Sequence, residues 1–377
     1  MDKTDGLFGA IFRLLSRIDL VMFMALLILL SLGGLTLYSA SGADYLSGDN
    51  MFIITRHFIH LGLAAVIMLL VAQLPSNLLN RVSVWIYLIG IILLVLVIIQ
   101  GTMGKGAQRW LDLGGFRFQP AEIMKLAVPM MVASYFSHKT LPPRFWNILV
   151  AAILVAVPMG LIIKQPDLGT ALLVGSAGFF VIYFAGIAWK WLIGGLIAVI
   201  GAAPLVFFYG MHPYQQQRVL TLLDPTADRL GSGYHIYQST IAIGSGGVYG
   251  KGWLNGDQSR LDFLPERHTD FIFAVFGEEF GLFGNVLLLT IYLFIIWRGL
   301  MLAAKGQDTF SRLLGGSLSL TFFVYLFVNT GMVSGILPVV GVPLPLVSYG
   351  GTSMVTLMAA FGLLMGLRKR KKGYGSF

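Results

Sequence analysis

A cluster of ionisable residues interrupts this hydrophobic chain at positions 261–270, which read LDFLPERHTD. Polar groups beside a long apolar run are costly to leave unpaired at a membrane boundary, so a functional role is their default interpretation. A carboxylate here could act as a general base that removes the proton of a hydroxyl group. Asp262 is the candidate for this base, because apolar neighbours flank it and disfavour its charged form. Glu266 and His268 follow closely and are candidate substrate-binding residues.

A second polar segment, at positions 104–125, carries groups suited to a phosphate ligand. Lys105 and Arg109 are cationic donors, and the guanidinium of arginine matches the geometry of phosphate oxygens. Glu122 and Lys125 are three residues apart at the start of an expected helix, so they share one helical face. They form either a structural ion pair or part of a substrate site, and the sequence leaves both interpretations open.

Three further segments supply candidate ligands. Asp167, in the short turn KQPDLGT, either caps the helix that follows or binds substrate or metal. Gln217 and Arg218, in the stretch YQQQR, suit recognition of a sugar by hydrogen bonds, and they equally suit an ordinary polar loop. Ser348 lies in a segment rich in proline and glycine at 335–353. Irregular backbone at membrane depth is tolerated only inside protein or beside a cavity, so this segment is expected to be re-entrant and close to a site.

The composition indicates the class of protein that must position these segments. The chain has 377 residues, of which 56% are hydrophobic and 11% charged, whereas a soluble domain carries about a quarter charged residues. We therefore predict an all-α integral membrane protein that forms a single polytopic domain over residues 1–377. The net charge of +9 is interpreted as an orientation signal rather than as nucleic-acid binding, because no basic stripe with interleaved aromatic residues is present.

About ten membrane spans are expected, since apolar runs of about 20 residues suit helices that cross about 30 Å of hydrocarbon. They cover approximately residues 20–40, 52–73, 82–100, 121–136, 147–164, 170–187, 190–209, 271–297, 312–336 and 346–367. Most lysine and arginine residues fall on the inner side if the N- and C-termini lie in the cytoplasm. The long connection at about 210–270, between the seventh and eighth spans, then lies outside and is expected to contain short surface helices. Basic residues left on that outer side indicate an anionic ligand there.

Several of these segments together resemble the SEDS family of shape, elongation, division and sporulation proteins. The matching stretches are GAQRWLDLG with QPAEIMKLA at 106–127, QPDLGT at 165–170, LPERHTDFIFAVFGEEFG at 264–281 and PLPLVSYGGTS at 343–353. Their number and order make the resemblance far more specific than any single motif, and it covers essentially the whole chain. The LDFLPERHTD stretch is more similar to the RodA-like branch of the family than to the FtsW-like branch.

The resemblance implies a peptidoglycan glycosyltransferase that polymerises lipid II on the outer face of the bacterial cytoplasmic membrane during cell elongation. It implies Asp262 as the essential aspartate of the long connection. It also implies a class B penicillin-binding protein, a transpeptidase, as partner, alongside lipid II, the polyprenyl-pyrophosphate glycan and other membrane proteins of the elongation machinery. A divalent cation, Mg²⁺ or Mn²⁺, could help to neutralise the pyrophosphate, although no His-x-x-x-His spacing is present. No organic cofactor is expected.

Two other classes of function stay open. A transporter that flips a lipid-linked precursor would also use many spans, a broken helix and intramembrane charges. Against it, most of the polar segments lie at the outer end, and little polar path crosses the middle. A non-catalytic scaffold for a crosslinking enzyme predicts that Asp262 is dispensable.

Overall fold

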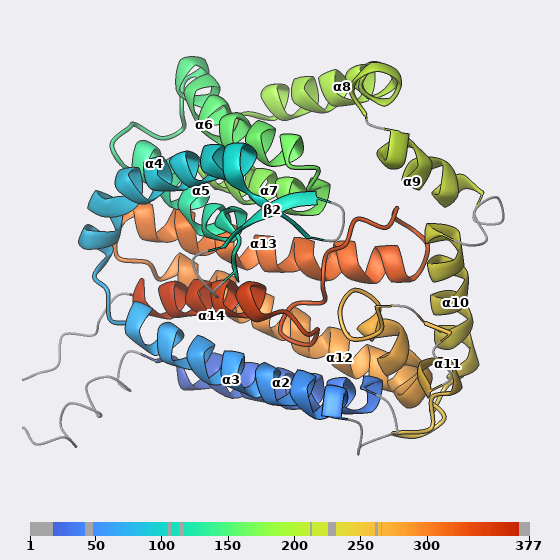
Figure 1. Cartoon of the computed structure of the whole chain (residues 1–377). Helices are drawn as coiled ribbons and strands as arrows, with labels where there is room; N and C mark the ends of the chain where they lie inside the picture. The colour runs from blue at the N-terminus through green and yellow to red at the C-terminus, as the bar shows by residue number, and fades with distance from the viewer. Residues whose placement is uncertain are drawn as a thin grey trace, which may run out of the picture.

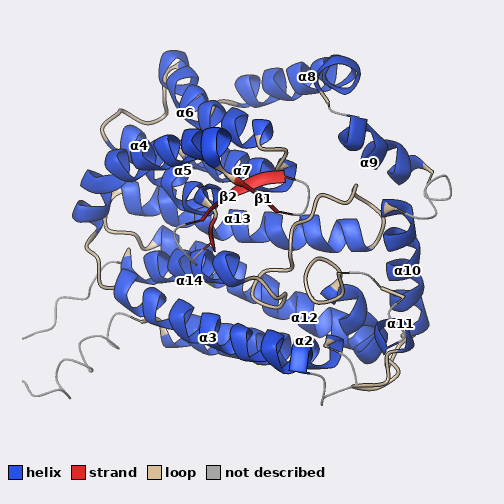
Figure 2. Ribbon diagram, in the orientation of Figure 1, coloured by secondary structure: helices blue, strands red, loops and turns tan. Residues whose placement is uncertain are grey.

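The computed structural model describes residues 18–41, 48–104, 107–112, 117–211, 213–224, 231–260, 263–264 and 266–368. Two of the predicted site residues, Lys105 and Asp262, lie outside these ranges. The described chain is mostly helical, and Figure 2 shows helices throughout the bundle.

The helices follow the apolar pattern of the sequence. In chain order they are α2 (Leu20–Ala40), α3 (Gly48–Val71), α4 (Ser76–Gln100), α5 (Pro120–Ser137), α6 (Phe145–Lys164), α7 (Leu168–Phe184), α8 (Trp189–Leu205), the π-helix η1 (Val206–Gly210), α9 (Pro213–Leu223), α10 (Ser232–Ser245), α11 (Asp257–Arg260), α12 (Ile272–Ala304), α13 (Thr309–Val333) and α14 (Gly351–Gly366). Each of the ten apolar ranges overlaps a helix, and α8 with η1 forms the seventh.

Within the described part of the chain, seven helices are long and apolar enough to cross a membrane. They are α2, the apolar part of α3, α4, α6, α8 with η1, α12 and α13. Two shorter apolar helices, α7 and α14, pack among them. The chain is therefore a multi-pass membrane protein.

The connection between α4 and α5 is not a plain loop. It forms a small antiparallel sheet in the order β1 (Thr102–Gly104), β2 (Ala107–Asp112) and β3 (Arg117–Phe118), drawn in red in Figure 2. The prediction of an all-α chain is wrong at this point. Pairing between the strands gives the backbone groups of this connection partners within the protein. The Gln108 side-chain amide also donates to the Gly101 carbonyl at 2.8 Å, where the sheet begins.

Helix α13 occupies the centre of the bundle (Figure 1). It packs against α12 on one side and against α5 and α7 on the other. Two clusters of buried apolar side chains meet along it, one built mainly by α2, α12 and α14 and the other by α4, α5, α6 and α7. By contrast, α8 has no buried residue and lies at the upper edge of Figure 1. The helices around α13 therefore form the frame that positions the polar segments.

An ion cluster around the buried carboxylate of Asp19 joins three chain segments at one end of the bundle. Asp19 caps α2 by accepting a hydrogen bond from the Met22 amide at 3.0 Å. Its carboxylate also accepts hydrogen bonds from Arg298 of α12, at 2.7 and 3.0 Å, and from Arg368, at 2.8 Å. Burial alone would raise the pKa of Asp19, but the hydrogen bonds and the two arginine charges together lower it. The start of α2 is thereby held beside the second half of α12 and the chain after α14.

The Asp19 cluster makes a pH-dependent contribution to stability. A carboxylate whose pKa is lowered by folding stabilises the fold above its unfolded pKa, about 3.9, and loses that contribution as pH falls through the folded value. We expect Asp19→Asn to lower the free energy of unfolding by about 2 kcal/mol at neutral pH, the scale of hydrogen bonds to a charged group. The difference should shrink below about pH 4. Thermal unfolding of both proteins in detergent across this range checks it, and a pH-independent difference contradicts it.

Helix α12 is broken at Gly281, toward the opposite end of the bundle. Gly281 has φ 64° and ψ −161°, so its backbone interrupts the helical ladder. In an unbroken helix the amides of residues 282 and 283 would donate to the carbonyls of residues 278 and 279. Here the segment 247–252 takes the place of both bonds. Its backbone hydrogen bonds with α12 are Leu282 N to Gly247 O at 2.9 Å, Phe283 N to Val248 O at 3.0 Å, Lys251 N to Glu278 O at 3.0 Å and Gly252 N to Glu279 O at 3.0 Å.

Candidate active site

The segment 334–350, called the Pro-rich segment below, connects α13 to α14 without regular secondary structure, and most of its second half is buried. The Tyr292 hydroxyl of α12 donates to the Pro345 carbonyl at 2.6 Å. A Cβ added to Gly33 of α2 would lie 2.8 Å from the Val347 Cα, so these two backbones are in direct contact. The neighbouring helices thus enclose the second half of the segment, as expected for irregular backbone that must be kept away from lipid.

Ser348 joins the turn at residues 266–270 to the Pro-rich segment by hydrogen bonds. Its hydroxyl donates to the Thr269 carbonyl at 2.5 Å and accepts a hydrogen bond from the Leu344 amide at 2.8 Å. The side chain is buried, and both partners are backbone groups. In this structure Ser348 positions the turn, and its predicted contact with substrate stays a prediction.

Two more contacts hold the same turn. The Tyr349 amide donates to the His268 carbonyl at 2.8 Å. The buried side-chain amide of Asn329 in α13 donates to the carbonyls of Asp270 and Val342, both at 2.8 Å. Asn329 was not predicted from the sequence. The signal was an amide within an apolar stretch of α13, FFVYLFVN, where a polar group needs a partner.

Asp270 faces the middle of the Pro-rich segment. Its Oδ2 lies 3.5 Å from the position that a Cβ on Gly341 would take, and the aspartate is half-buried while the glycine is exposed. Phe271, the next residue, is the N-cap residue of α12. Glu266, at the other end of the turn, is exposed, and its Oε2 accepts a hydrogen bond from the Thr269 hydroxyl at 2.9 Å.

The start of α7 lies against the other side of the Pro-rich segment. A Cβ added to Gly169 would lie 2.9 Å from the Val340 carbonyl oxygen, so only a glycine allows this approach. Asp167 is the N-cap residue of α7, and its carboxylate accepts a hydrogen bond from the Thr170 amide at 3.1 Å. The capping interpretation of Asp167 agrees with this geometry.

Arg109 and Asp167 come together although they are far apart in the sequence. Arg109, on β2, donates to the Pro166 carbonyl at 2.8 Å, and its Nη1 lies 3.7 Å from Oδ2 of Asp167. The Gln119 amide donates to the same carboxylate oxygen at 3.0 Å. The Arg109 side chain is 31% exposed. A guanidinium that is held at one edge and partly open to solvent is suited to bind a pyrophosphate.

Glu122 and Lys125 form a buried ion pair. Lys125 Nζ lies 2.7 Å from Oε1 of Glu122, and the two side chains are 6% and 8% exposed, respectively. Lys125 Nζ also lies 5.2 Å from the ring centroid of Tyr325 in α13, within the range of a cation–π contact. The pair lies at the packed interface of α5 and α13, so its position favours the structural interpretation over substrate binding.

Gln217 and Arg218 are not brought to these groups. Both lie on α9, whose main neighbour is α10. Figure 1 shows α9 set apart from α7 and β2. Sequence alone carries no information on this separation, because it depends on how the segment between α8 and α12 folds.

The metal-binding potential of the site is limited to what the described residues offer. Among them, no group of three or more His, Asp or Glu side chains is positioned to hold a metal ion. Mg²⁺ commonly binds through one or two carboxylates together with substrate phosphates. A cation at this site would therefore take most of its ligands from a pyrophosphate.

Comparison with known proteins finds relatives over nearly the whole chain. The FtsW, RodA and SpoVE family model, described as "Cell cycle protein", matches residues 19–373. Peptidoglycan glycosyltransferase MrdB of Escherichia coli is 51% identical over 357 residues, which cover 94% of this chain and 95% of that protein. A probable peptidoglycan glycosyltransferase FtsW of Geobacter metallireducens is 34% identical over 366 residues, which cover 95% and 96%.

Two solved structures share the fold. A chain from a peptidoglycan synthase complex, described as coordinating polymerization and crosslinking, has a TM-score of 0.78 at 30% identity and covers 92% of this chain and 96% of its own length. The rod shape determining protein RodA of Thermus thermophilus has a TM-score of 0.70 at 28% identity, with 94% and 98% covered.

Proposed function

This chain belongs to the FtsW/RodA/SpoVE family of cell cycle proteins, also called the SEDS family, and on that premise we propose that it is a peptidoglycan glycosyltransferase that polymerises lipid II. Its similarity to MrdB over nearly the full length of both chains supports this activity. The observation that carries the proposal is the packing of two motifs on one Pro-rich segment. The turn at 266–270 lies on one side and the start of α7, with Arg109, on the other.

The proposed topology has ten spans, α2 to α8 and α12 to α14, in the bacterial cytoplasmic membrane. Both termini lie in the cytoplasm, where the positive-inside trend favours them. The segment at about 210–270, with α9, α10 and α11, then forms the extracytoplasmic connection. The Pro-rich segment enters the bundle from the outer face, so the candidate site faces outward.

The proposed reaction transfers a glycan from its lipid carrier. The donor is the growing chain on polyprenyl pyrophosphate, and the acceptor is the sugar 4-hydroxyl of lipid II. A carboxylate removes the hydroxyl proton as the oxygen attacks the anomeric carbon. The bond from that carbon to the pyrophosphate breaks, and the configuration inverts. Arg109, helped by Lys105, stabilises the negative charge that develops on the leaving pyrophosphate.

Two aspartates are candidates for the general base. Asp262 corresponds to the essential aspartate implied by the family resemblance and lies outside the described residues. Asp270 is half-buried and lies beside an exposed part of the Pro-rich segment, where an acceptor hydroxyl could approach it. Replacing each aspartate separately with asparagine distinguishes the two candidates.

The proposed partner is a class B penicillin-binding protein that crosslinks the product, acting with other membrane proteins of the elongation machinery. The similarity to a chain of a peptidoglycan synthase complex supports it. Mg²⁺ or Mn²⁺ is proposed as a cofactor that neutralises pyrophosphate charge, with the pyrophosphate as its main ligand.

Polymerisation of lipid II by the purified protein with its crosslinking partner tests the activity and the base together. The unmodified protein, Asp262→Asn and Asp270→Asn are compared by the length of the glycan on gels. We expect long glycan from the unmodified protein and none from the variant that lacks the base, although that variant folds and binds the partner. Loss in Asp270→Asn alone assigns the base to Asp270, and loss in Asp262→Asn alone assigns it to Asp262.

Other outcomes overturn parts of the proposal. Full activity in both variants removes the base assignment. No glycan from the unmodified protein, with its partner and with either cation, removes the polymerase activity. Translocation of lipid II in vesicles then identifies a transporter, and its absence leaves a scaffold.

A further inference from the structure

We infer that Glu278, together with Lys251, is a positioning residue that sets the orientation of the first part of α12 and thereby of the turn at 266–270. The inference rests on the proposed function, because that turn carries Asp270, a candidate base. Glu278 lies within α12, and the turn at 266–270 comes just before that helix, so the inferred effect on the turn passes through α12.

The break at Gly281 separates residues 272–280 from the rest of α12. A helix that is interrupted by non-helical backbone does not transmit its direction through the hydrogen-bond ladder. Tertiary contacts must therefore set the tilt of this first part. Asp270 lies two residues before this first part, and residues 272 to 278 span about 9 Å of the helix axis at 1.5 Å per residue. A small change in tilt at Glu278 therefore displaces the Asp270 carboxylate.

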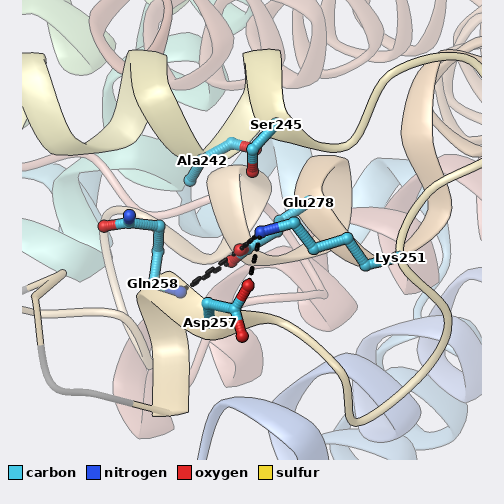
Figure 3. A network of polar contacts seen from close by, with 6 residues as sticks. All are labelled: Ala242, Ser245, Lys251, Asp257, Gln258 and Glu278. Atoms are coloured by element: carbon cyan, nitrogen blue, oxygen red, sulfur yellow. Dashed lines mark hydrogen bonds and ion pairs between the residues drawn. The ribbon is translucent and has the colours of Figure 1, made fainter.

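Glu278 is the centre of a polar network on that first part (Figure 3). Its side chain is 0% exposed, and Oε1 accepts a hydrogen bond from Lys251 Nζ at 2.8 Å. Both carboxylate oxygens also lie 3.2 Å from the backbone amide of Gln258, which donates to them. Lys251 donates a second hydrogen bond to Oδ2 of Asp257 at 2.9 Å. The buried Glu278 carboxylate thus binds Lys251 and Gln258, two residues of the connection between α10 and α12.

The inner half of this network is the energetically important half. Asp257 is 69% exposed, and exposed ion pairs contribute little. Glu278 is fully buried, and removing the cation from a buried ion pair strongly destabilises the folded protein. Partial burial lowers the pKa of Lys251, but the hydrogen bonds to Glu278 and Asp257 outweigh this effect and raise it. The ammonium therefore stays charged at neutral pH, and the Lys251–Glu278 bond persists.

Backbone contacts also hold the chain before Lys251 against α12. The Lys251–Glu278 pair can nevertheless be changed without disturbing those backbone contacts. A Cβ added to Gly246 would lie 2.2 Å from the Gly277 carbonyl oxygen, so the end of α10 also touches the first part of α12. Substitutions at such glycines would disturb packing. Glu278→Gln, by contrast, keeps the volume and one acceptor oxygen, while it removes the charge and replaces the other oxygen with an NH2 donor.

The test compares Glu278→Gln, Lys251→Met and Lys251→Arg in the protein with its partner. We expect kcat for lipid II polymerisation to fall by about 10- to 100-fold in the first two, since a displacement of about 1 Å can reduce a rate by that factor. KM for lipid II should change less than about threefold, because the substrate contacts remain. Amide hydrogen exchange at 266–276 should be faster in both. Lys251→Arg keeps the charge, so its kcat and its rate of hydrogen exchange should be close to those of the unmodified protein.

The matched control is Asp308→Asn, at the opposite end of the bundle. Asp308 is the N-cap residue of α13, and its carboxylate accepts hydrogen bonds from the Ser311 amide at 2.7 Å and from the Ser76 hydroxyl at 2.9 Å. The Asp308→Asn substitution should lower thermal stability without changing kcat or hydrogen exchange at 266–276. The inference is overturned if Glu278→Gln leaves that exchange unchanged, or if Asp308→Asn changes it equally. Exchange is measured without substrate, so a protein that makes no glycan refutes the proposed function alone.

Discussion

Replacing Gly250 with alanine is expected to lower the free energy of unfolding by about 2–5 kcal/mol. Gly250 has φ +81°, and left-handed backbone costs an L-residue about 1–2 kcal/mol. A Cβ would also lie 2.1 Å from the Glu279 carbonyl oxygen, and overpacking of this kind costs about 1–3 kcal/mol. The clashing atom belongs to the backbone of α12, so it cannot move aside as the end of a flexible side chain could. Thermal unfolding in detergent measures the loss.

Gly247→Ala is the matched control for this prediction. Gly247 lies in the same segment and also has positive φ, +56°, but nothing lies within 4 Å of the position of its Cβ. Its replacement should cost only the backbone term, about 1–2 kcal/mol. Equal losses at Gly247 and Gly250 would show that the close contact with α12 is unimportant.

Lys125→Met is expected to destabilise the protein by about 3–5 kcal/mol, the scale for removing one partner of a buried ion pair. Glu122 would remain in the α5–α13 interface without its cation at 2.7 Å. The methionine has a similar length and fills the space of the lysine stem, so the loss reports the charge rather than a cavity. Denaturation in detergent measures it, and a variant as stable as the unmodified protein would contradict it.

The double variant Glu122→Gln/Lys125→Met separates the two interpretations of this pair. Without either charge, most of the stability should return, because no buried ion is left without a partner. If the stable double variant polymerises lipid II at a normal rate, the pair is structural. If it is stable but inactive, the pair belongs to the substrate site, against the position that the structure gives it.

The helices were largely predictable because the bilayer constrains them so strongly. A span needs about 20 apolar residues, and its backbone must satisfy its own hydrogen bonds, so an apolar run predicts a helix with few alternatives. α2 begins and ends at the predicted residues, 20 and 40. α14 begins at Gly351, later than predicted, because residues 346–350 remain in the Pro-rich segment. The sheet at β1 to β3 was missed, since strand pairing depends on contacts that apolar periodicity does not report.

The candidate site was predictable as a set of segments but not as a set of contacts. The spacing of Glu122 and Lys125 indicates their pairing, because neighbours on one helical face meet wherever the helix lies. The meeting of Arg109 with Asp167 and the separation of Gln217 from both depend on chain segments far apart in sequence. Ser348 was predicted to bind substrate, which stays a prediction, and the bonds of its hydroxyl to the backbone at 269 and 344 were not foreseen.

By itself the sequence determined the class of protein, the approximate helices and the segments that carry the family resemblance. These features follow from local composition and from motifs that are contiguous in the chain. Only the tertiary structure decided that residues 247–252 replace two hydrogen bonds of α12, that Asn329 holds the 266–270 turn, and that Glu278 rather than a ligand receives Lys251. The physical reason is that a buried polar group must find a partner, and which partner it finds depends on how distant segments pack.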